Sequence, residues 1–410
     1  MKILLVGAGL SGAVIGRIPG IPTATRRRLR SIRQIALKGR GGRLLSTTMA
    51  RSSGKPLRRI LIVSDNRAYT SEQQFAPLIR HSAAIAARTG IVFTFMDLAE
   101  AKALPAEGFA GWAAVGLKLM FATPAAEAAD IAQHIFGAAK AAGARTILFD
   151  GDDDLSILWP DVLDAADVCI KKHMYDNLDT YTRTFVGKSN LTDYCHRTFD
   201  VSFADNIIPR SGGLSPKQIG KIVLGWNIAQ DDKIYNLAND IPVQVTEGPR
   251  DIDILCRASV APGTWTYGMR HGAVEALSRI TDRYRIHAPT DRVSQAEYYG
   301  EMLRARLSVS PFGFGELCWR DFESILCGSL LIKPDMSHLK TWPDLFVPFE
   351  TYIPVAWDYS DLERVCAPYI ADEDARRRIT SAARLRLTEA LKTRVFTERF
   401  EALLHTIHMI

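Results

Sequence analysis

The sequence lacks any run of about 18 apolar residues, which is the length that a membrane-spanning helix needs. It also lacks acidic residues at its start: the first 64 residues contain fourteen Lys or Arg and no Asp or Glu. Subtracting these fourteen charges from the net +6 of the 410-residue chain leaves −8 for the remainder. A mildly acidic body argues against nucleic-acid binding, which favours a basic face.

Paired cysteines are also missing. The six cysteines lie far apart, and no two of them form a Cys-x-x-Cys pair. This spacing fits neither a disulfide framework nor a zinc site. We therefore expect reduced, mostly buried thiols in a cytoplasmic protein.

The stretch MKILLVGAGLSGAVIG has the glycine turn of a dinucleotide-binding fold, but the acid that completes such a site is absent. The stretch resembles the N-terminus of UDP-galactopyranose mutases, which implies FAD binding. However, Pro19 and Pro22 end the following helix early, and no Asp or Glu precedes Asp65 to hold a ribose. We expect residues 1–57 to be a basic, disordered arm with a truncated glycine turn, called the N-terminal arm below.

Strand-like and helix-like segments alternate from residue 58 onward. Residues 60–63 form an apolar, β-branched run that ends in polar residues, as buried parallel strands do. The alternation restarts near residue 251 with RDIDILCRAS. It predicts an α/β fold of two tandem Rossmann-like domains, and a chain of this length can bury two cores. The expected units are residues 58–247, residues 248–371, and C-terminal helices over residues 372–410 that pack across both domains.

The block SVSPFGFGELCWRDFESILCG, residues 308–328, carries the most chemistry. A strand ends in a turn that holds Gly313 and Gly315, and a helix begins near Glu316. Such a turn directs backbone N–H groups and the positive helix end toward an anionic ligand. Arg320 and Glu323 share a helix face, so the arginine could neutralise a diphosphate while the glutamate accepts from ribose hydroxyls. An ion pair between these two side chains on a surface helix is the alternative.

The same block resembles the donor-binding segment of bacterial GT-B glycosyltransferases of the group-1 and exostosin-like kind. The shared pattern is a Gly-rich turn, an Arg, Phe-Glu, Cys-Gly and an apolar strand, and the resemblance extends over residues 250–370. It implies that the second domain holds a nucleotide-diphosphate sugar, without a bound metal. The donor-binding residues would be Arg257, Gly313, Gly315, Glu316, Arg320 and Glu323.

Two points stay open within this resemblance. Arg257 follows the first strand of the second domain and could contribute a cation to the diphosphate, or it could form a structural salt bridge. For Arg270 the structural role is expected. Retaining members place two glutamates eight positions apart, whereas position 315 is a glycine, so the anomeric outcome is open.

The first domain supplies three candidates for a catalytic base, namely Asp65, Asp152 and His173. Each follows an expected strand and would face the cleft from the acceptor side, where a base could take a proton from an acceptor hydroxyl. Asp150-Gly151-Asp152 also has the Asp-x-Asp form by which GT-A glycosyltransferases hold Mg²⁺ or Mn²⁺. We expect no metal and no cofactor, with metal binding at this motif as the alternative.

These features predict a hexosyltransferase-like enzyme that moves a sugar from a nucleotide-diphosphate donor to a glycan or lipid-linked glycan in cell-surface polysaccharide synthesis. The alternatives are an FAD-dependent, UDP-galactopyranose mutase-like enzyme and a non-catalytic sugar-binding protein. We expect a cytoplasmic protein; for its N-terminal arm, contact with an anionic membrane surface, a targeting peptide and a solvated segment stay open as alternatives. The donor sugar and base, the acceptor, the linkage and the oligomeric state stay open.

Overall fold

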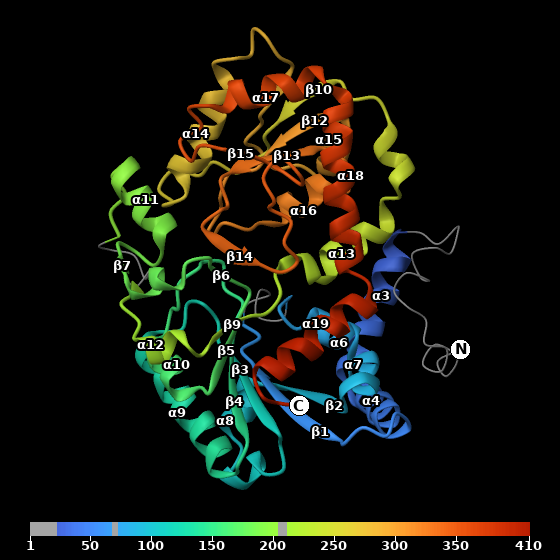
Figure 1. Ribbon diagram of the computed structural model, residues 1–410, viewed down its shortest axis with the longest axis vertical. Helices are drawn as coiled ribbons and strands as arrows, with labels where there is room; N and C mark the ends of the chain where they lie inside the picture. Colours follow the sequence, from blue (N-terminus) through green and yellow to red (C-terminus); the bar gives the residue numbers. More distant parts are fainter. Residues whose placement is uncertain (1–22, 68–72, 204–210) are drawn as a thin grey trace.

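A computed structural model of the chain describes residues 23–67, 73–203 and 211–410. Two sheets, each covered by helices, lie in separate halves of the molecule (Figure 1). Every neighbouring strand pair within either sheet is parallel. The structure therefore confirms an α/β fold with two Rossmann-like domains.

The first sheet has the strand order β2-β1-β3-β4-β5-β9. The first strand along the chain, β1, is buried from Ile60 onward because residues 60–63 are an unbroken apolar run and helices cover both faces of the sheet. The strands are β1 (Arg58–Ser64), β2 (Ile91–Asp97), β3 (Ala114–Lys118), β4 (Arg145–Asp150), β5 (Val168–Lys171) and β9 (Ile222–Leu224). The helices among them are α6 (Ala76–Arg80), α7 (Ser82–Thr89), α8 (Leu98–Lys102), α9 (Ala125–Ala141) and α10 (Pro160–Ala165).

The second sheet has the strand order β11-β10-β12-β13-β15. The strands are β10 (Ile252–Leu255), β11 (Ile286–His287), β12 (Ala305–Val309), β13 (Leu330–Pro334) and β15 (Ile353–Val355). The helices that connect them are α14 (Tyr267–Ser278), α15 (Gln295–Arg304), α16 (Trp319–Leu326) and α17 (Leu362–Ala371). Loops follow the carboxyl ends of β10 and β12, which is where ligands bind in sheets of this kind.

Smaller elements join the two halves. β6 (His173–Tyr175) of the first half pairs antiparallel with β14 (Leu339–Thr341) of the second. The remaining elements between the sheets are β7 (Thr184–Phe185), α11 (Asn190–Phe199), β8 (Ser211–Gly212), α12 (Pro216–Ile219) and α13 (Asp232–Asp240). Short 3-10 helices span Ala106–Phe109, Leu178–Thr182, Ile228–Gln230 and Val243–Glu247.

The C-terminal helices pack across both halves, as the sequence predicts. α18 (Glu373–Ala390) contacts α16 and β13 of the second half. α19 (Thr393–Thr406) returns to the first half, where Phe396 and Phe400 are buried in the same cluster as Phe93 and Trp226. Figure 1 shows this change of side at the end of the chain.

The N-terminal arm differs from the disordered segment that we expected. Residues 23–52 form α3 (Thr23–Lys38) and α4 (Arg40–Ser52), and α4 packs along α7. Gly42, Ser46 and Ala50 recur every fourth residue and are buried on one face of α4, so small side chains allow close packing. Ala50 shares a cluster with Ala86 and Val92. The glycine turn of residues 7–12 lies outside the described residues, and no helix in the described ranges is long and apolar enough to cross a membrane.

Candidate active site

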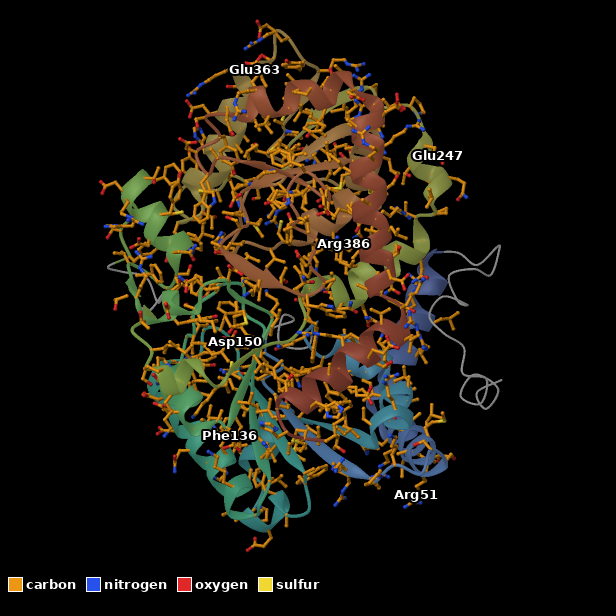
Figure 2. All side chains as sticks on the ribbon, viewed as in Figure 1. Arg51, Phe136, Asp150, Glu247, Glu363 and Arg386 are labelled. Atoms are coloured by element: carbon orange, nitrogen blue, oxygen red, sulfur yellow. The ribbon has the colours of Figure 1, made fainter. Side chains whose placement is uncertain are left out.

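The loops after β4 and β12 meet where the two halves of the molecule face each other. A Cβ atom on Gly315 would lie 1.6 Å from the carbonyl oxygen of Asp153, a distance that no side chain tolerates. The turn that the sequence predicts to bind a donor therefore touches the acidic loop of the first domain through a glycine. Figure 2 shows Asp150, which begins this acidic loop, at the end of the lower sheet that faces the upper half.

The acidic loop is neutralised by lysines from neighbouring strands. Asp150 pairs with Lys171 at 2.9 Å, and Asp152 pairs with Lys118 at 2.7 Å. Burial raises the pKa of Asp152, and the Asp150 carboxylate adds to this effect although Lys118 opposes it. One oxygen of each carboxylate thus accepts from a lysine, and no three His, Cys, Asp or Glu side chains in the described ranges are grouped to hold a metal ion.

Asp65 ends β1 at the same edge of the sheet, but it is engaged locally. Its carboxylate is buried and forms an ion pair with Arg67, with 2.7 Å between Oδ2 of Asp65 and Nη2 of Arg67. Burial raises the pKa of Asp65, yet the hydrogen bonds from Arg67 outweigh burial and leave it below its usual value. Both carboxylates are thus held by a cation at 2.7 Å, and they differ in the direction of the pKa shift, which is downward for Asp65 and upward for Asp152.

His173 and Glu316 lie opposite each other in the contact between the two halves. Both side chains are fully buried, and Nε2 of His173 lies 3.9 Å from Oε2 of Glu316. Neither ring nitrogen of His173 has a hydrogen-bond partner of ordinary geometry among the described residues. Burial, followed by the charges of Lys172 and Lys171, holds the pKa of His173 well below its usual value. The imidazole is therefore neutral at pH 7, and its lowered pKa makes it a weaker proton acceptor than an ordinary histidine.

Two guanidinium groups flank the glycine turn on the side of the second domain. Arg320 donates to neutral acceptors only: Ser310 Oγ at 3.0 Å and the backbone oxygens of Pro311 and Arg257 at 2.8 and 2.9 Å. Arg270 donates to the backbone oxygen of Ser259 at 3.0 Å, and its Nη2 lies 3.1 Å from the position of a Cβ on Gly313. Within the part of the chain that the structure describes, neither guanidinium has a carboxylate at ion-pair distance.

Burial and then the nearby charge of Arg320 lower the pKa of Arg270, which stays charged at neutral pH. Two guanidinium charges without a carboxylate partner in the described ranges create a positive potential that attracts anions. We call Arg270 and Arg320 the arginine pair.

Arg257 is engaged elsewhere. It makes two 2.6 Å bonds to the Glu301 carboxylate and a 3.2 Å ion pair with Asp291. These bonds hold the pKa of Arg257 above its usual value. The geometry matches the structural salt bridge that we kept as the alternative, and a role for Arg257 in donor binding stays a prediction.

Glu323 does not pair with Arg320, although the two residues lie on the same helix. Its carboxylate accepts from the hydroxyls of Tyr298 and Tyr299 at 3.0 and 3.1 Å, and it pairs with Lys233 of α13 at 2.7 Å. The alternative of a surface ion pair is therefore wrong. The glutamate is oriented by three donors, one of which a ribose would have to replace.

The structure thus brings part of the predicted set together. The turn from Gly313 to Glu316 touches the arginine pair at one end and Asp153 with His173 at the other. Other side chains hold Asp65, Asp152, Arg257 and Glu323 in ion pairs. Sequence reasoning missed the lysines that neutralise the acidic loop, although Lys118 and Lys171 each end an apolar strand, which is a visible pattern.

No protein-family model matches the chain, and no curated protein matches it in sequence. Solved structures with a similar arrangement include HepE of Anabaena in complex with UDP, with a TM-score of 0.47 and 9% identity over 85% of this chain and 100% of that chain. A glycosyltransferase from Rickettsia africae has a TM-score of 0.47 and 12% identity over 86% and 99%. MnaA of S. aureus, solved with UDP, has a TM-score of 0.41 and 9% identity over 87% and 98%. At these identities the likeness concerns the fold alone.

Proposed function

We propose that the protein is a glycosyltransferase that takes a sugar from a nucleotide-diphosphate donor held at the arginine pair. One observation carries this proposal: two guanidiniums without a carboxylate partner among the described residues flank a glycine turn, at the carboxyl ends of β10 and β12. Ligands of doubly wound sheets bind at that edge. Arg270 and Arg320 together match the two charges of a diphosphate.

The arginine pair would act most strongly as the bond to the sugar breaks. The departing nucleoside diphosphate then gains negative charge, and fixed cations stabilise a charge that develops in the transition state. Such cations need no reorganisation during the reaction. Arg320 is already fixed by its three hydrogen bonds to Ser310, Pro311 and Arg257.

The opposite face offers the base. Asp152, whose pKa is raised, is the stronger candidate to take a proton from an acceptor hydroxyl once Lys118 releases it, and the lowered pKa of His173 makes the imidazole a weaker second candidate. Gly315 and the Asp153 carbonyl fill the space between the two faces. Admission of substrates would therefore require these two loops to separate.

We further propose that the transferred group is a hexose and that the acceptor is a glycan or lipid-linked glycan of the cell surface. The protein would act in the cytoplasm, and its N-terminal arm would contact an anionic membrane. The residues resembling the donor segment and the fourteen basic residues before Asp65 support these finer points.

A thermal-shift screen of the full chain against UDP-, GDP-, dTDP- and CMP-sugars tests the proposal. A ligand that binds only the folded form raises its apparent stability. At least one diphosphate donor should raise the melting temperature, and CMP-sugars, which carry a single phosphate, should do so less. The best donor should lose about 10- to 100-fold in affinity in Arg320→Ala, because hydrogen bonds to charged groups contribute about 1.5–3 kcal/mol.

Arg304→Ala is the matched control. Arg304 belongs to the same domain, but it is exposed and pairs with Asp251 at 2.5 Å. Its removal should leave donor affinity unchanged. A donor that binds wild type and Arg320→Ala equally well would overturn the proposal.

A further inference from the structure

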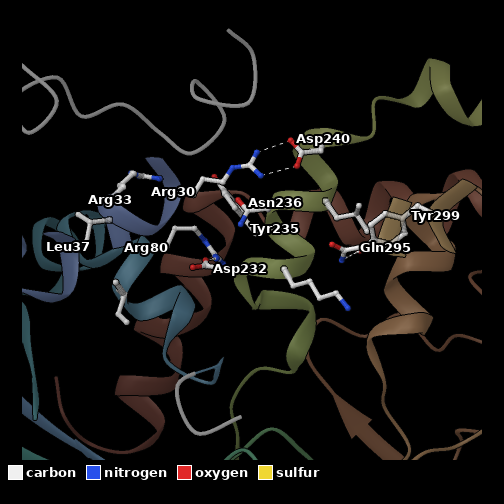
Figure 3. Close-up of a pocket in the computed structure, with 13 residues that line it drawn as sticks. Arg30, Arg33, Leu37, Arg80, Asp232, Tyr235, Asn236, Asp240, Gln295 and Tyr299 are labelled. Atoms are coloured by element: carbon white, nitrogen blue, oxygen red, sulfur yellow. Dashed lines mark hydrogen bonds and ion pairs between the residues drawn. The ribbon is translucent and has the colours of Figure 1, made fainter. Parts of the chain in front are cut away.

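A second cationic site lies away from the arginine pair, where the N-terminal arm meets the junction of the two halves. A pocket of about 320 Å³ opens between α3, α6, α13 and α15 (Figure 3). Its wall includes four cations, Arg30, Arg33, Arg80 and Lys233, and two carboxylates, Asp232 and Asp240. The charge of the wall is therefore positive.

Three of these four cations form ion pairs with carboxylates in the described ranges, and the fourth, Arg33, does not. Arg30 makes two 2.8 Å bonds to Asp240, Arg80 pairs with Asp232, and Lys233 pairs with Glu323 behind the wall at 2.7 Å. Arg33 makes neither a hydrogen bond nor an ion pair with any side chain in the described ranges. The Nε atom of Arg30 is buried and also lacks a partner there.

An unmatched guanidinium in this position costs free energy. Burial is the main reason that the pKa of Arg33 lies below its usual value; Tyr235 and Asp232 oppose the shift, and the charge of Arg80 adds to it. The group stays charged at neutral pH, and a charge partly removed from water is unfavourable unless it is paired. An anion in the pocket would remove this cost. Figure 3 shows Arg33 extending from α3 toward the space that Arg80 and Tyr235 border.

The arrangement of hydrogen-bond donors around the pocket selects among anions. They come from three helices, α3, α6 and α13, and so approach from different directions. A carboxylate presents two oxygens in one plane, whereas a phosphate monoester presents three oxygens around phosphorus and carries a charge of about −1.5 to −2 at pH 7. Guanidiniums bind such oxygens in a bidentate manner. The amides of Asn236 and Gln295 on the wall suit a hydroxylated remainder.

We propose that this pocket binds the phosphate of a phosphomonoester, with Arg33 as the residue whose charge the ligand neutralises. The pocket does not include Arg270 or Arg320, although Lys233 and Tyr299 on its wall also contact Glu323. The phosphomonoester could be a small free metabolite or the headgroup of a lipid, because both present the same oxygens. The experiment below distinguishes these sources.

Isothermal titration of the full chain with inorganic phosphate and with glycerol 3-phosphate tests the soluble source. Flotation with phosphatidylcholine vesicles, with and without phosphatidic acid, tests the lipid source. Arg33→Gln should weaken binding of the active probe by about tenfold or more. Arg33→Lys, which keeps the charge, should retain part of the affinity.

Arg51→Gln is the matched control, because Arg51 lies on the next helix, is exposed and is absent from the pocket wall. It removes the same charge and should bind like wild type. Without ligand, Arg33→Gln should melt at or above the wild-type temperature, which separates lost binding from lost folding. If wild type binds neither probe, or if Arg33→Gln binds as well as wild type, the proposal is wrong. Because no nucleotide is used, this result is independent of the donor assignment.

Discussion

Replacing Gly315 by alanine should force the two domains apart. The added Cβ would lie 1.6 Å from the Asp153 carbonyl oxygen, whereas ordinary contacts begin near 3.4 Å. The two loops must therefore separate by roughly 2 Å, and atoms in a well-packed contact that is opened lose much of their dispersion energy. Overpacking of this kind costs about 1–3 kcal/mol of unfolding free energy. The contact between His173 and Glu316 would open at the same time.

Urea unfolding together with amide hydrogen exchange measures both effects. Gly315→Ala should lower the unfolding free energy by about 1–3 kcal/mol and should reduce protection in residues 151–157 and 310–317. Gly300→Ala is the control, since a Cβ there meets no atom within 4 Å and should be neutral or stabilising. Wild-type stability and wild-type protection in Gly315→Ala would show that the two loops are not in contact.

Three further predictions follow from the buried charges and from the N-terminal arm. The lowered pKa of His173 means that the unfolded state binds more protons below about pH 6.5. The free energy of unfolding should therefore decrease as the pH falls below this value, by up to about 1.4 kcal/mol per pH unit. His173→Asn should reduce this dependence in unfolding measured at pH 7 and pH 5.5. An unchanged pH dependence would contradict the assignment. Arg257→Ala should reduce stability by about 2 kcal/mol, because it leaves Glu301 without its main partner, and should leave donor affinity intact; a selective loss of donor affinity in titration calorimetry would instead support the sequence-based role. Deleting residues 1–55 should lower the melting temperature by exposing the face of α7 that α4 covers, and an unchanged melting temperature would contradict the packing around Ala50.

The sheets could be predicted from the sequence because their information is local. Residues 60–63 are a short apolar run, residues 252–255 are apolar apart from Asp253, and both lead into polar residues, a pattern typical of a buried parallel strand. The N-terminal arm could not be predicted in the same way. The buried face of α4 consists of Gly42, Ser46 and Ala50, which give little hydrophobic pattern. Their partner Ala86 is visible only once the chain is folded.

For the candidate site too, features that are local in the sequence could be predicted, and contacts between distant segments could not. The sequence places Arg320 beside the glycine turn because the two are neighbours in the chain. It could not show that Arg257 forms an ion pair with Glu301 or that Asp152 forms one with Lys118, because each of these pairs joins segments far apart in sequence. For the same reason Arg270 was expected to be structural, although it lies against Gly313 without an acidic partner in the described ranges.

The most direct measurement is a crystal structure of the full chain with a bound nucleoside diphosphate. If the arginine pair is the donor site, the diphosphate oxygens will lie within hydrogen-bond distance of both Arg270 and Arg320, beside the turn from Gly313 to Glu316. A diphosphate bound at another place, with both guanidiniums left in their present contacts, would contradict the account.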